Sequence, residues 1–241
     1  MLRVACPGND SGECDQYYVG PGRYESSRPI KIDFFSSSKT LVSKIHCGSQ
    51  HTLALTTAGD VYSWGCNDDG ALGRVGSPEN TPAKIDLPFK VDSLTAGDSH
   101  SLFINSTNGI IYMSGVYRNV LKGNMTDVFK TPVQIGRKQF QGKSLTKVTS
   151  GVNHTFVLLK GEVFAWGDPE TGVIARKASV RRKFKQGLQI EAIGIRGVTD
   201  VFAGENCGFL TKQITNRRTK ESRFVTLAWG LNNYGQLGIG N

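Results

Sequence analysis

The stretch AGDSHSLFI, residues 96–104, occurs in related form at four places in the chain. The other three copies are CGSQHTLAL (47–55), SGVNHTFVL (150–158) and AGENCGFLT (203–211). The glycines that mark the copies, Gly48, Gly97, Gly151 and Gly204, are spaced 49, 54 and 53 residues apart. A nearly constant period of this length indicates a chain built from repeated structural units.

Each repeat contains four short segments with the length and composition of β-strands. The marked stretch is preceded by an alternating segment and followed, after a turn, by a second apolar run, and a further segment lies upstream. β-Branched and aromatic residues are frequent in these segments, and Gly, Pro, Asn or Asp bound them, as is typical of strands and hairpin turns. The second apolar runs are GDVYSWG (59–65), NGIIYMSG (108–115), KGEVFAWG (160–167) and RFVTLAWG (223–230), and the upstream segments are RPIKIDF (28–34), TPAKIDL (81–87), TPVQIGR (131–137) and GLQIEAI (187–193).

Four strands in every period of about fifty residues are typical of the blades of a β-propeller. We therefore expect an all-β fold with about four blades. The expected blade limits are 28–80, 81–130, 131–186 and 187–241, and residues 1–27 are interpreted as the divergent remnant of a preceding blade. Because GQLGIGN (235–241) resembles a turn between blades, we expect the ring to be incomplete.

Asp98 and His100 stand two residues apart, as the members of a catalytic pair could. However, His51, His100 and His154 occupy the same position of successive repeats, and Cys207 takes this position in the fourth. A residue that recurs from blade to blade is expected to support the blade, by bridging backbone groups where strands converge. No local group of three or four ligand residues accompanies these histidines, so we expect no metal site.

The net charge of +9 favours acidic partners, such as nucleic acid or the acidic surface of a protein. Two basic runs, RKASVRRKFK (176–185) and NRRTKESR (216–223), carry much of it, although solvated loops are the simpler explanation of such runs. The five cysteines are an odd number without a C-x-x-C motif, so reduced thiols of the cytosol or nucleus are expected rather than a disulfide framework. The sequence contains no apolar run long enough for a transmembrane helix, and its first residues do not form a signal peptide.

The motifs CNDDGALGR (66–74), AGDSHS (96–101), KQGLQ (185–189) and WGLNNYGQLG (229–238) resemble the regulator of chromosome condensation family. The pattern of G-x-x-H-[TS], W-G and G-x-L-G is shared by the whole superfamily, which includes ubiquitin ligases and plant ultraviolet-B receptors. CNDDGALGR is more specific and favours the family's exchange factors for the small GTPase Ran. The resemblance covers essentially the whole chain and implies a seven-bladed propeller, with about three blades missing downstream.

This resemblance implies that the protein is a guanine nucleotide exchange factor for a Ran-like GTPase, without covalent chemistry and without a cofactor. On the face that binds the GTPase, Asp98 and Arg176 match family residues. Asn153 stands where the family has an aspartate, so it keeps an acceptor oxygen but lacks the charge. The connection 116–127 matches the family's protruding wedge, for which the candidate contact residues are Tyr117, Arg118, Asn119, Lys122 and Asp127.

The resemblance also implies a nuclear, chromatin-associated protein without a membrane partner. Arg181 and Arg182 lie in a run that matches the family loop on the acidic patch of the nucleosome. The planar guanidinium groups of these arginines suit bidentate contact with carboxylates. The segment AIGIRGV (192–198) matches a loop that touches DNA phosphate, with Arg196 as its single cation.

Other interpretations of the same residues stay open. Asp98 could cap its own loop and Arg176 could pair locally, as polar loop residues commonly do. The alternative function is a non-catalytic propeller that acts as a protein-interaction module of a larger protein. A hydrolase or a metalloenzyme is the least favoured class.

Overall fold

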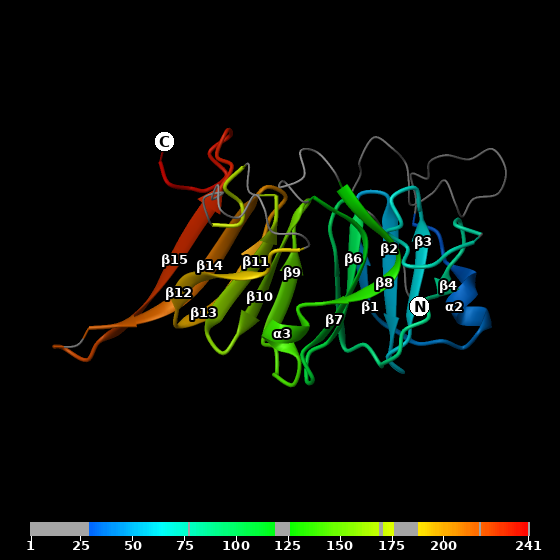
Figure 1. Ribbon diagram of the computed structural model, residues 1–241, viewed down its shortest axis with the longest axis horizontal. Coiled ribbons are helices and arrows are strands. Elements are labelled where there is room, and N and C mark those ends of the chain that lie inside the picture. The colour runs from blue at the N-terminus through cyan, green and yellow to red at the C-terminus, as the bar shows by residue number, and fades with distance from the viewer. Residues whose placement is uncertain are drawn as a thin grey trace. The chain divides into compact units, whose positions relative to one another are not determined.

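The computed structural model describes residues 29–76, 78–118, 126–168, 171–175, 188–216 and 218–240, with the backbone alone at 117, 118, 126 and 127 (Figure 1). The chain divides into two compact units. Unit 1 comprises the described residues up to Asn105 together with Ile111–Val116 and Val128–Gln134, and unit 2 comprises Ser106–Ile110, the described residues of Tyr117–Asp127 and those from Ile135 onward.

Unit 1 contains one four-stranded antiparallel sheet and the greater part of a second. Both follow the order of the sequence, so each strand pairs with the next. The first consists of β1 (Val42–Cys47), β2 (His51–Thr56), β3 (Val61–Gly65) and β4 (Ala83–Lys84), and the second of β5 (Ser93–Ala96), β6 (His100–Asn105), β7 (Ile110–Arg118) and β8 (Thr126–Ile135).

Unit 2 contains one four-stranded and one three-stranded sheet, again with neighbouring strands paired in sequence order. The first consists of β9 (Lys147–Ser150), β10 (His154–Leu159), β11 (Glu162–Gly167) and β12 (Glu191–Arg196), and the second of β13 (Val198–Ala203), β14 (Cys207–Thr215) and β15 (Ser222–Gly230). Each of the four sheets is built around the hairpin of one sequence repeat, which confirms the prediction of an all-β chain with about four propeller blades.

The outermost strand of a sheet comes from the beginning of the next sequence repeat. β4 lies in the segment 81–87, yet it pairs with β3 through Tyr62↔Lys84 and Ser63↔Ala83. Likewise, β12 pairs with β11 of the preceding repeat. Sheet membership therefore differs from the limits 28–80, 81–130, 131–186 and 187–241, because a strand next to a hairpin covers the hairpin's open edge. The apolar pattern indicates a strand but not the edge that it joins.

The segment 28–34, which the sequence predicts as a strand, contains a single bridge residue at Lys31 and then the short helix α2 (Asp33–Ser37). A strand would direct neighbouring side chains to opposite faces. The helical turn instead lets Phe34 and Phe35 both approach Tyr62, with ring centroids 5.5 and 5.6 Å away. Packing of two consecutive aromatic rings on one neighbour accounts for the difference.

Each unit has its own apolar core. Strands β2 and β10 are buried along their whole length because both of their faces are covered. In unit 1 the core lies around Leu53, Leu94 and Phe103, and in unit 2 around Phe156, Val201 and Leu210. Trp64 and Trp166 are buried.

Every sheet has two distinct ends. We call the end with the G-x-x-H loops the loop end, and the end with the hairpin turns that follow β2, β6, β10 and β14 the turn end. Gly59, Gly109 and Gly161 have positive φ in the first three of these turns, as the predicted hairpin connections require. Asp98 and Asn153, two of the residues predicted to contact the GTPase, lie at the loop ends of their sheets.

Candidate functional site

The four G-x-x-H loops have a common backbone framework. In each repeat a glycine lies at or near the end of the second strand of the hairpin that follows the loop. The residue after this glycine donates its backbone N–H to the carbonyl of the last loop residue, the one before the repeated histidine or cysteine. A Cβ on that glycine would collide with the accepting carbonyl oxygen. These bonds join Cys66 to Gln50 (2.7 Å), Val116 to Ser99 (2.8 Å), Asp168 to Asn153 (2.9 Å) and Leu231 to Asn206 (2.9 Å). The loop end is therefore a preformed backbone scaffold.

Neighbouring loops within a unit are also joined to each other. In unit 1 the N–H of Ser49 donates to the carbonyl of Asp98 at 3.4 Å. In unit 2 the N–H of Val152 donates to the carbonyl of Glu205 at 3.0 Å. Asp98 and Glu205 thus hold equivalent places, each following the glycine of its loop and each bonded to the loop before it.

Asp98 is half-buried, and its Oδ2 lies 3.4 Å from the hydroxyl of Ser99. Beneath it lie the buried imidazoles of His51 and His100. Burial lowers the pKa of each from 6.5 to about 4, although the nearby Asp98 carboxylate acts in the opposite direction. Both rings are therefore neutral at pH 7, which argues against an Asp98–His100 pair that exchanges a proton at that pH.

His51 takes part in a chain of hydrogen bonds that crosses from one sheet of unit 1 to the next. Its Nε2 lies 2.8 Å from the Oγ of Ser101, and that hydroxyl donates to the carbonyl of Ala71 at 2.7 Å. Since the single hydroxyl proton of Ser101 is used by Ala71, Nε2 of His51 is the donor. The predicted structural role of the repeated histidines is confirmed for His51, which bridges to a backbone carbonyl through Ser101.

The loop end of unit 2 contains Asn153, Glu205 and Asn206. Asn153 and Asn206 are half-buried, whereas Glu205 is exposed. Burial, with a further contribution from Glu205, raises the pKa of the Cys207 thiol. Glu205 is absent from the residues predicted for this face, although its position after Gly204 matches that of Asp98 after Gly97.

The loop 66–74, which carries the most specific family motif, lies at the loop end of unit 1. The side chain of Asn67 closes it, since its Oδ1 accepts the N–H of Leu72 at 3.1 Å and its Nδ2 donates to the carbonyl of Arg74 at 2.9 Å. Asn232 repeats the first of these bonds in unit 2, accepting the N–H of Leu237 at 3.0 Å. The G-x-L-G motif is thus a turn fixed by an asparagine.

The other predicted residues divide between described and undescribed parts of the chain. Tyr117 and Arg118 end β7 and Asp127 lies at the start of β8, and for these residues the backbone alone is described. Asn119, Lys122, Arg176, Arg181 and Arg182 lie outside the described residues. The wedge side chains and the arginines of the basic run are therefore not placed.

Arg196 is exposed at the end of β12, opposite Glu162 in the strand register. Since Glu162 begins β11 directly after the hairpin turn, Arg196 lies at the turn end. Asn153 lies at the loop end of the same sheet. Within unit 2 the residue predicted to meet DNA phosphate and the residue predicted to meet the GTPase are thus at opposite ends.

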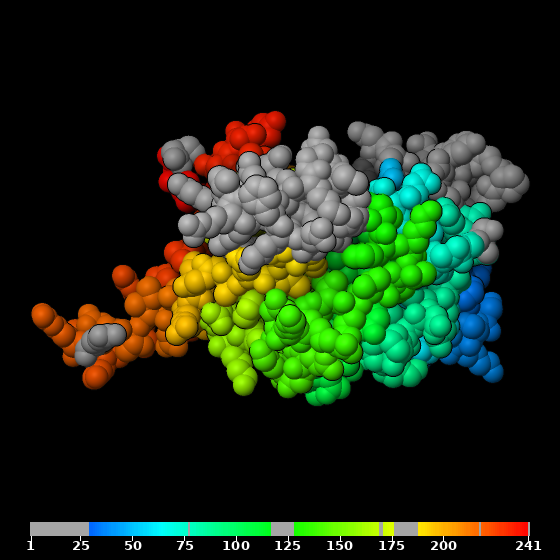
Figure 2. Space-filling view, viewed as in Figure 1, coloured from blue at the N-terminus to red at the C-terminus, as the bar shows by residue number. Residues whose placement is uncertain are grey.

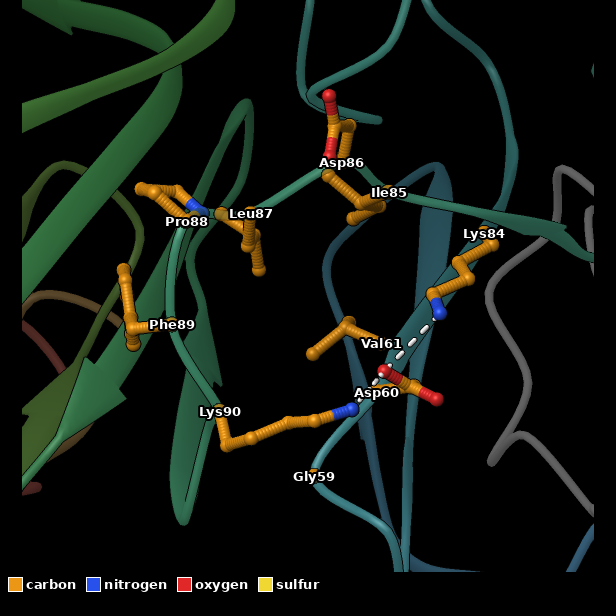
Figure 3. A pocket seen from close by; sticks show the side chains of 10 residues that line it. All are labelled: Gly59, Asp60, Val61, Lys84, Ile85, Asp86, Leu87, Pro88, Phe89 and Lys90. Atoms are coloured by element: carbon orange, nitrogen blue, oxygen red, sulfur yellow. Dashed lines mark hydrogen bonds and ion pairs between the residues drawn. The ribbon is translucent and has the colours of Figure 1, made fainter.

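A pocket of about 350 Å³ lies at the turn end of unit 1, between the turn at Gly59 and the segment Lys84–Lys90 (Figure 3). Oδ1 of Asp60 accepts the ammonium groups of Lys90 at 2.7 Å and Lys84 at 3.1 Å, and these bonds lower the pKa of the Asp60 carboxyl. None of the predicted site residues lines this pocket. Both of its lysine ammonium groups already contact a carboxylate.

Across the described residues, no group of three or more His, Cys, Asp or Glu side chains is arranged to hold a metal ion. The helices α2 and α3 (Arg137–Phe140) are far too short to span a membrane, and no longer apolar helix occurs in the part of the chain that the structure describes.

Comparison with known proteins finds matches to the regulator of chromosome condensation (RCC1) repeat at residues 42–71 and 58–104. The guanine nucleotide exchange factor SRM1 of Saccharomyces cerevisiae is 31% identical over 99% of this chain and 55% of that protein. The human regulator of chromosome condensation is 30% identical over 94% of this chain and 55% of that protein. The chain thus spans about half the length of these relatives.

Among solved structures, Prp20p from Saccharomyces cerevisiae, reported with its binding properties to Gsp1p and histones, matches with a TM-score of 0.75 and 30% identity. The match covers 95% of this chain and 53% of that one. The human ubiquitin ligase HERC2 is 29% identical over 95% of this chain, which corresponds to 5% of the ligase. These repeats therefore also occur as a small part of a much larger protein.

Proposed function

Since the chain belongs to the regulator of chromosome condensation repeat family, we propose that it is a guanine nucleotide exchange factor for a Ran-like small GTPase and that it associates with chromatin in the nucleus. The names of its relatives support an exchange function, and the binding of Prp20p to Gsp1p and histones supports both kinds of partner. The observation that carries the proposal is the position of Asp98, on a loop whose backbone is fixed on both sides.

Exchange requires no covalent step. A GTPase holds its nucleotide through backbone amides, a lysine and Mg²⁺ around the phosphates. A protein that binds the nucleotide-free form more tightly than the loaded form accelerates release. The exchange factor therefore needs rigidly held polar groups that face the GTPase elements around the phosphates. The backbone bonds of Asp98 to Ser49 and of Ser99 to Val116 give the Asp98 carboxylate that rigidity.

In unit 2 the proposed contact groups are Asn153 and Glu205. Asn153 supplies a neutral acceptor, so the negative charge at the loop end of unit 2 comes from Glu205, which is exposed in the place equivalent to Asp98. We assign Arg176 and the wedge residues Tyr117, Arg118, Asn119, Lys122 and Asp127 to the same interface, on the family resemblance alone.

The proposed chromatin contacts are Arg181 and Arg182 with the acidic patch of histones, and Arg196 with DNA phosphate. Exposure of Arg196 at the turn end of unit 2 supports this assignment, since Asn153 and Glu205 lie at the opposite end of that unit. A cation there can meet phosphate while the loop end meets the GTPase.

Release of fluorescent GDP from Ran tests the exchange proposal, with the full-length protein as catalyst. Asp98→Asn should lower the exchange rate roughly 10- to 100-fold, because loss of one desolvated charge contact costs on the order of 2 kcal/mol. Asp86→Asn is the matched control, since Asp86 is an exposed carboxylate at the turn end of unit 1 and should leave the rate unchanged. Absence of acceleration by the unaltered protein would overturn the proposal.

Glu205→Gln tests the assignment in unit 2 by the same assay. If Glu205 supplies the missing charge, Glu205→Gln should lower the exchange rate about as much as Asp98→Asn does. Asn153→Asp should then raise the exchange rate, because it adds a second carboxylate. An unchanged rate in Glu205→Gln would remove this residue from the interface.

Binding to reconstituted nucleosomes tests the chromatin part. Changing Arg181 and Arg182 together to Glu should abolish most of the binding, because two cations become two repelling anions at the acidic patch. Binding that is undiminished by the double change would refute the assignment.

The alternative is a protein-interaction module without exchange activity, and the HERC2 match favours it because there the repeats form a small part of a ligase. The two functions differ in a single measurement. A module would bind partners yet leave the rate of GDP release from Ran unchanged at saturating protein concentration.

A further inference from the structure

The hairpin of β14 and β15 is longer than the sheet to which it belongs. The register of the two strands continues to Thr215↔Ser222, whereas β13 ends its pairing with β14 at Val198↔Lys212. Residues 213–216 and 218–224 therefore extend past the third strand, and they project as a two-stranded ribbon (Figures 1 and 2). By contrast, the hairpin of β10 and β11 ends at Leu159↔Glu162, with a turn of two residues. We call residues 213–224 the basic arm.

Local hydrogen bonds hold the end of the basic arm in one conformation. Asn216 donates its N–H to the carbonyl of Glu221 at 2.8 Å and accepts the N–H of Lys220 on its own carbonyl at 2.9 Å. Its side-chain oxygen accepts the N–H of Arg218 at 2.9 Å. The hydroxyls of Thr215 and Ser222 meet at 2.8 Å just below. Arg218 and Lys220 are therefore presented from a hydrogen-bonded backbone.

The arm carries positive charge that the described part of the molecule does not neutralise. Arg218, Lys220 and Arg223 are exposed, and no described carboxylate forms an ion pair with them. The one acidic residue of the arm, Glu221, accepts the hydroxyl of Thr219 at 3.1 Å. Exposed Arg196 lies at the same end of unit 2, so the turn end of this unit is basic on two elements.

We infer that the basic arm is a binding element for the phosphate backbone of duplex nucleic acid, which it contacts independently of base sequence. This inference rests on the chromatin part of the proposed function and adds to it a surface that the family resemblance does not include. A two-stranded ribbon fits the major groove of DNA, and lysines, arginines and hydroxyl groups are the side chains that contact phosphates. The arm supplies all three kinds, because Thr215, Thr219 and Ser222 lie among its cations.

The distribution of apolar residues argues against a lipid surface as the occupant. Ile214 and Phe224 are exposed but lie at the base of the arm, whereas its tip, Asn216–Glu221, consists of polar and charged residues. A hairpin that enters a membrane interface carries its apolar side chains where it enters. Phosphates of a duplex, in contrast, require cations at the most exposed point.

Fluorescence anisotropy with a labelled 25-base-pair duplex, titrated at several salt concentrations, tests the inference with the full chain. Changing Arg218, Lys220 and Arg223 together to Gln should lower affinity at least about tenfold near 0.1 M salt and reduce the slope of log K against log salt by roughly 2 to 3. The matched control changes Lys31, Lys39 and Lys44 to Gln, which removes the same charge from unit 1. It should alter affinity less than about threefold. Equal losses in both triple variants, or none in either, would overturn the inference.

Shortening the arm provides a second variant that does not depend on the three glutamines. Replacement of residues 213–224 by Asn-Gly joins Lys212 to Val225 with a two-residue hairpin turn. This variant should lose as much duplex affinity as the triple variant and keep the melting temperature of the unaltered protein.

Nucleosome binding and GDP release separate this inference from the proposed function. If the unaltered protein binds neither duplex nor nucleosome, the chromatin proposal itself fails. If it binds both and the arm variants bind equally well, only the role of the arm is refuted.

Discussion

In each unit a buried backbone carbonyl lies at the seam, the contact between neighbouring sheets, and different side chains donate hydrogen bonds to it in the two units. In unit 1 the carbonyl of Ala71 accepts the hydroxyls of Ser101 at 2.7 Å and Ser114 at 3.2 Å. In unit 2 the equivalent carbonyl, that of Val173, accepts the indole N–H of Trp229 at 2.6 Å. Gly208 and Trp229 stand where unit 1 has Ser101 and Ser114. The repeats thus retain a donor for this buried carbonyl rather than a particular residue.

Gly208 and Trp229 depend on each other. A Cβ at Gly208 would lie 2.5 Å from the Cε2 and Cζ2 atoms of the Trp229 ring, closer than nonbonded carbons can approach. The ring also packs edge-on against Phe156, with centroids 5.3 Å apart. A residue without a side chain therefore makes room for the indole, and the indole supplies the donor that this residue cannot.

Acid should distinguish the units most strongly, because unit 1 buries two imidazoles, His51 and His100, with pKa values of about 4, whereas unit 2 buries one, His154. Each imidazole takes up a proton below pH 6.5 when unfolded but only below about pH 4 when folded. The contribution to stability is therefore complete above pH 6.5 and is lost as the pH falls toward 4, by about 3 kcal/mol per histidine. Urea denaturation across pH 7 to 4 measures it. His51→Gln should flatten the dependence by about one proton, and an unchanged slope would contradict the assigned pKa.

Gly208→Ala should be the most damaging substitution at the seam of unit 2. The new methyl group forces the Trp229 ring out of place and deprives the carbonyl of Val173 of its donor, so a loss of about 3 kcal/mol is expected from overpacking and an unsatisfied buried acceptor. Urea denaturation gives the loss. Gly142→Ala is the comparison for backbone strain alone, because Gly142 has a positive φ and no neighbour within 4 Å of the new atom, whereas Gly208 lacks a positive φ and meets the indole. A loss of stability in Gly208→Ala below about 0.5 kcal/mol would show that the clash with the indole is relieved without cost.

Trp229→Phe should cost less, about 2 kcal/mol, since most of the apolar contact remains and only the donor to Val173 is removed. Ser101→Ala is the corresponding change in unit 1, where Ser114 continues to donate to Ala71 while the Nε2–H of His51 loses its acceptor. Chemical denaturation of both variants should give similar losses. A loss below about 0.5 kcal/mol in Trp229→Phe would mean that the hydrogen bond contributes little.

The smallest expected effect is the coupling between the two positions of unit 2. Gly208→Ser in the background of Trp229→Ser reproduces the serine pair of unit 1 and removes the clash. In that background Gly208→Ser should cost at least about 1 kcal/mol less than it does alone, as a double-mutant cycle measures. Additive losses would indicate that the two positions act independently.

Local patterns in the sequence are sufficient for the repeat, the four sheets and the hairpin turns. Alternating apolar residues and the glycines of turns act on their immediate neighbours, so the strand hairpins around His51 and His154 follow from the pattern. The repeat position and the family resemblance predict Asp98 as a contact residue, and the same alignment of repeats could have proposed Glu205. The helical turn at Phe35 could not, because packing on Tyr62 overrides the strand pattern of 28–34.

Contacts between segments far apart in the chain account for the rest. Tertiary packing decides which sheet β4 or β12 joins and which side chain donates to the carbonyl of Val173. It also decides which loop lies next to the loop of Asn153. A backbone carbonyl is chemically the same in every residue, so its partner cannot be inferred from the residue that carries it. Hydroxyl and indole donors satisfy it equally well, and packing selects between them.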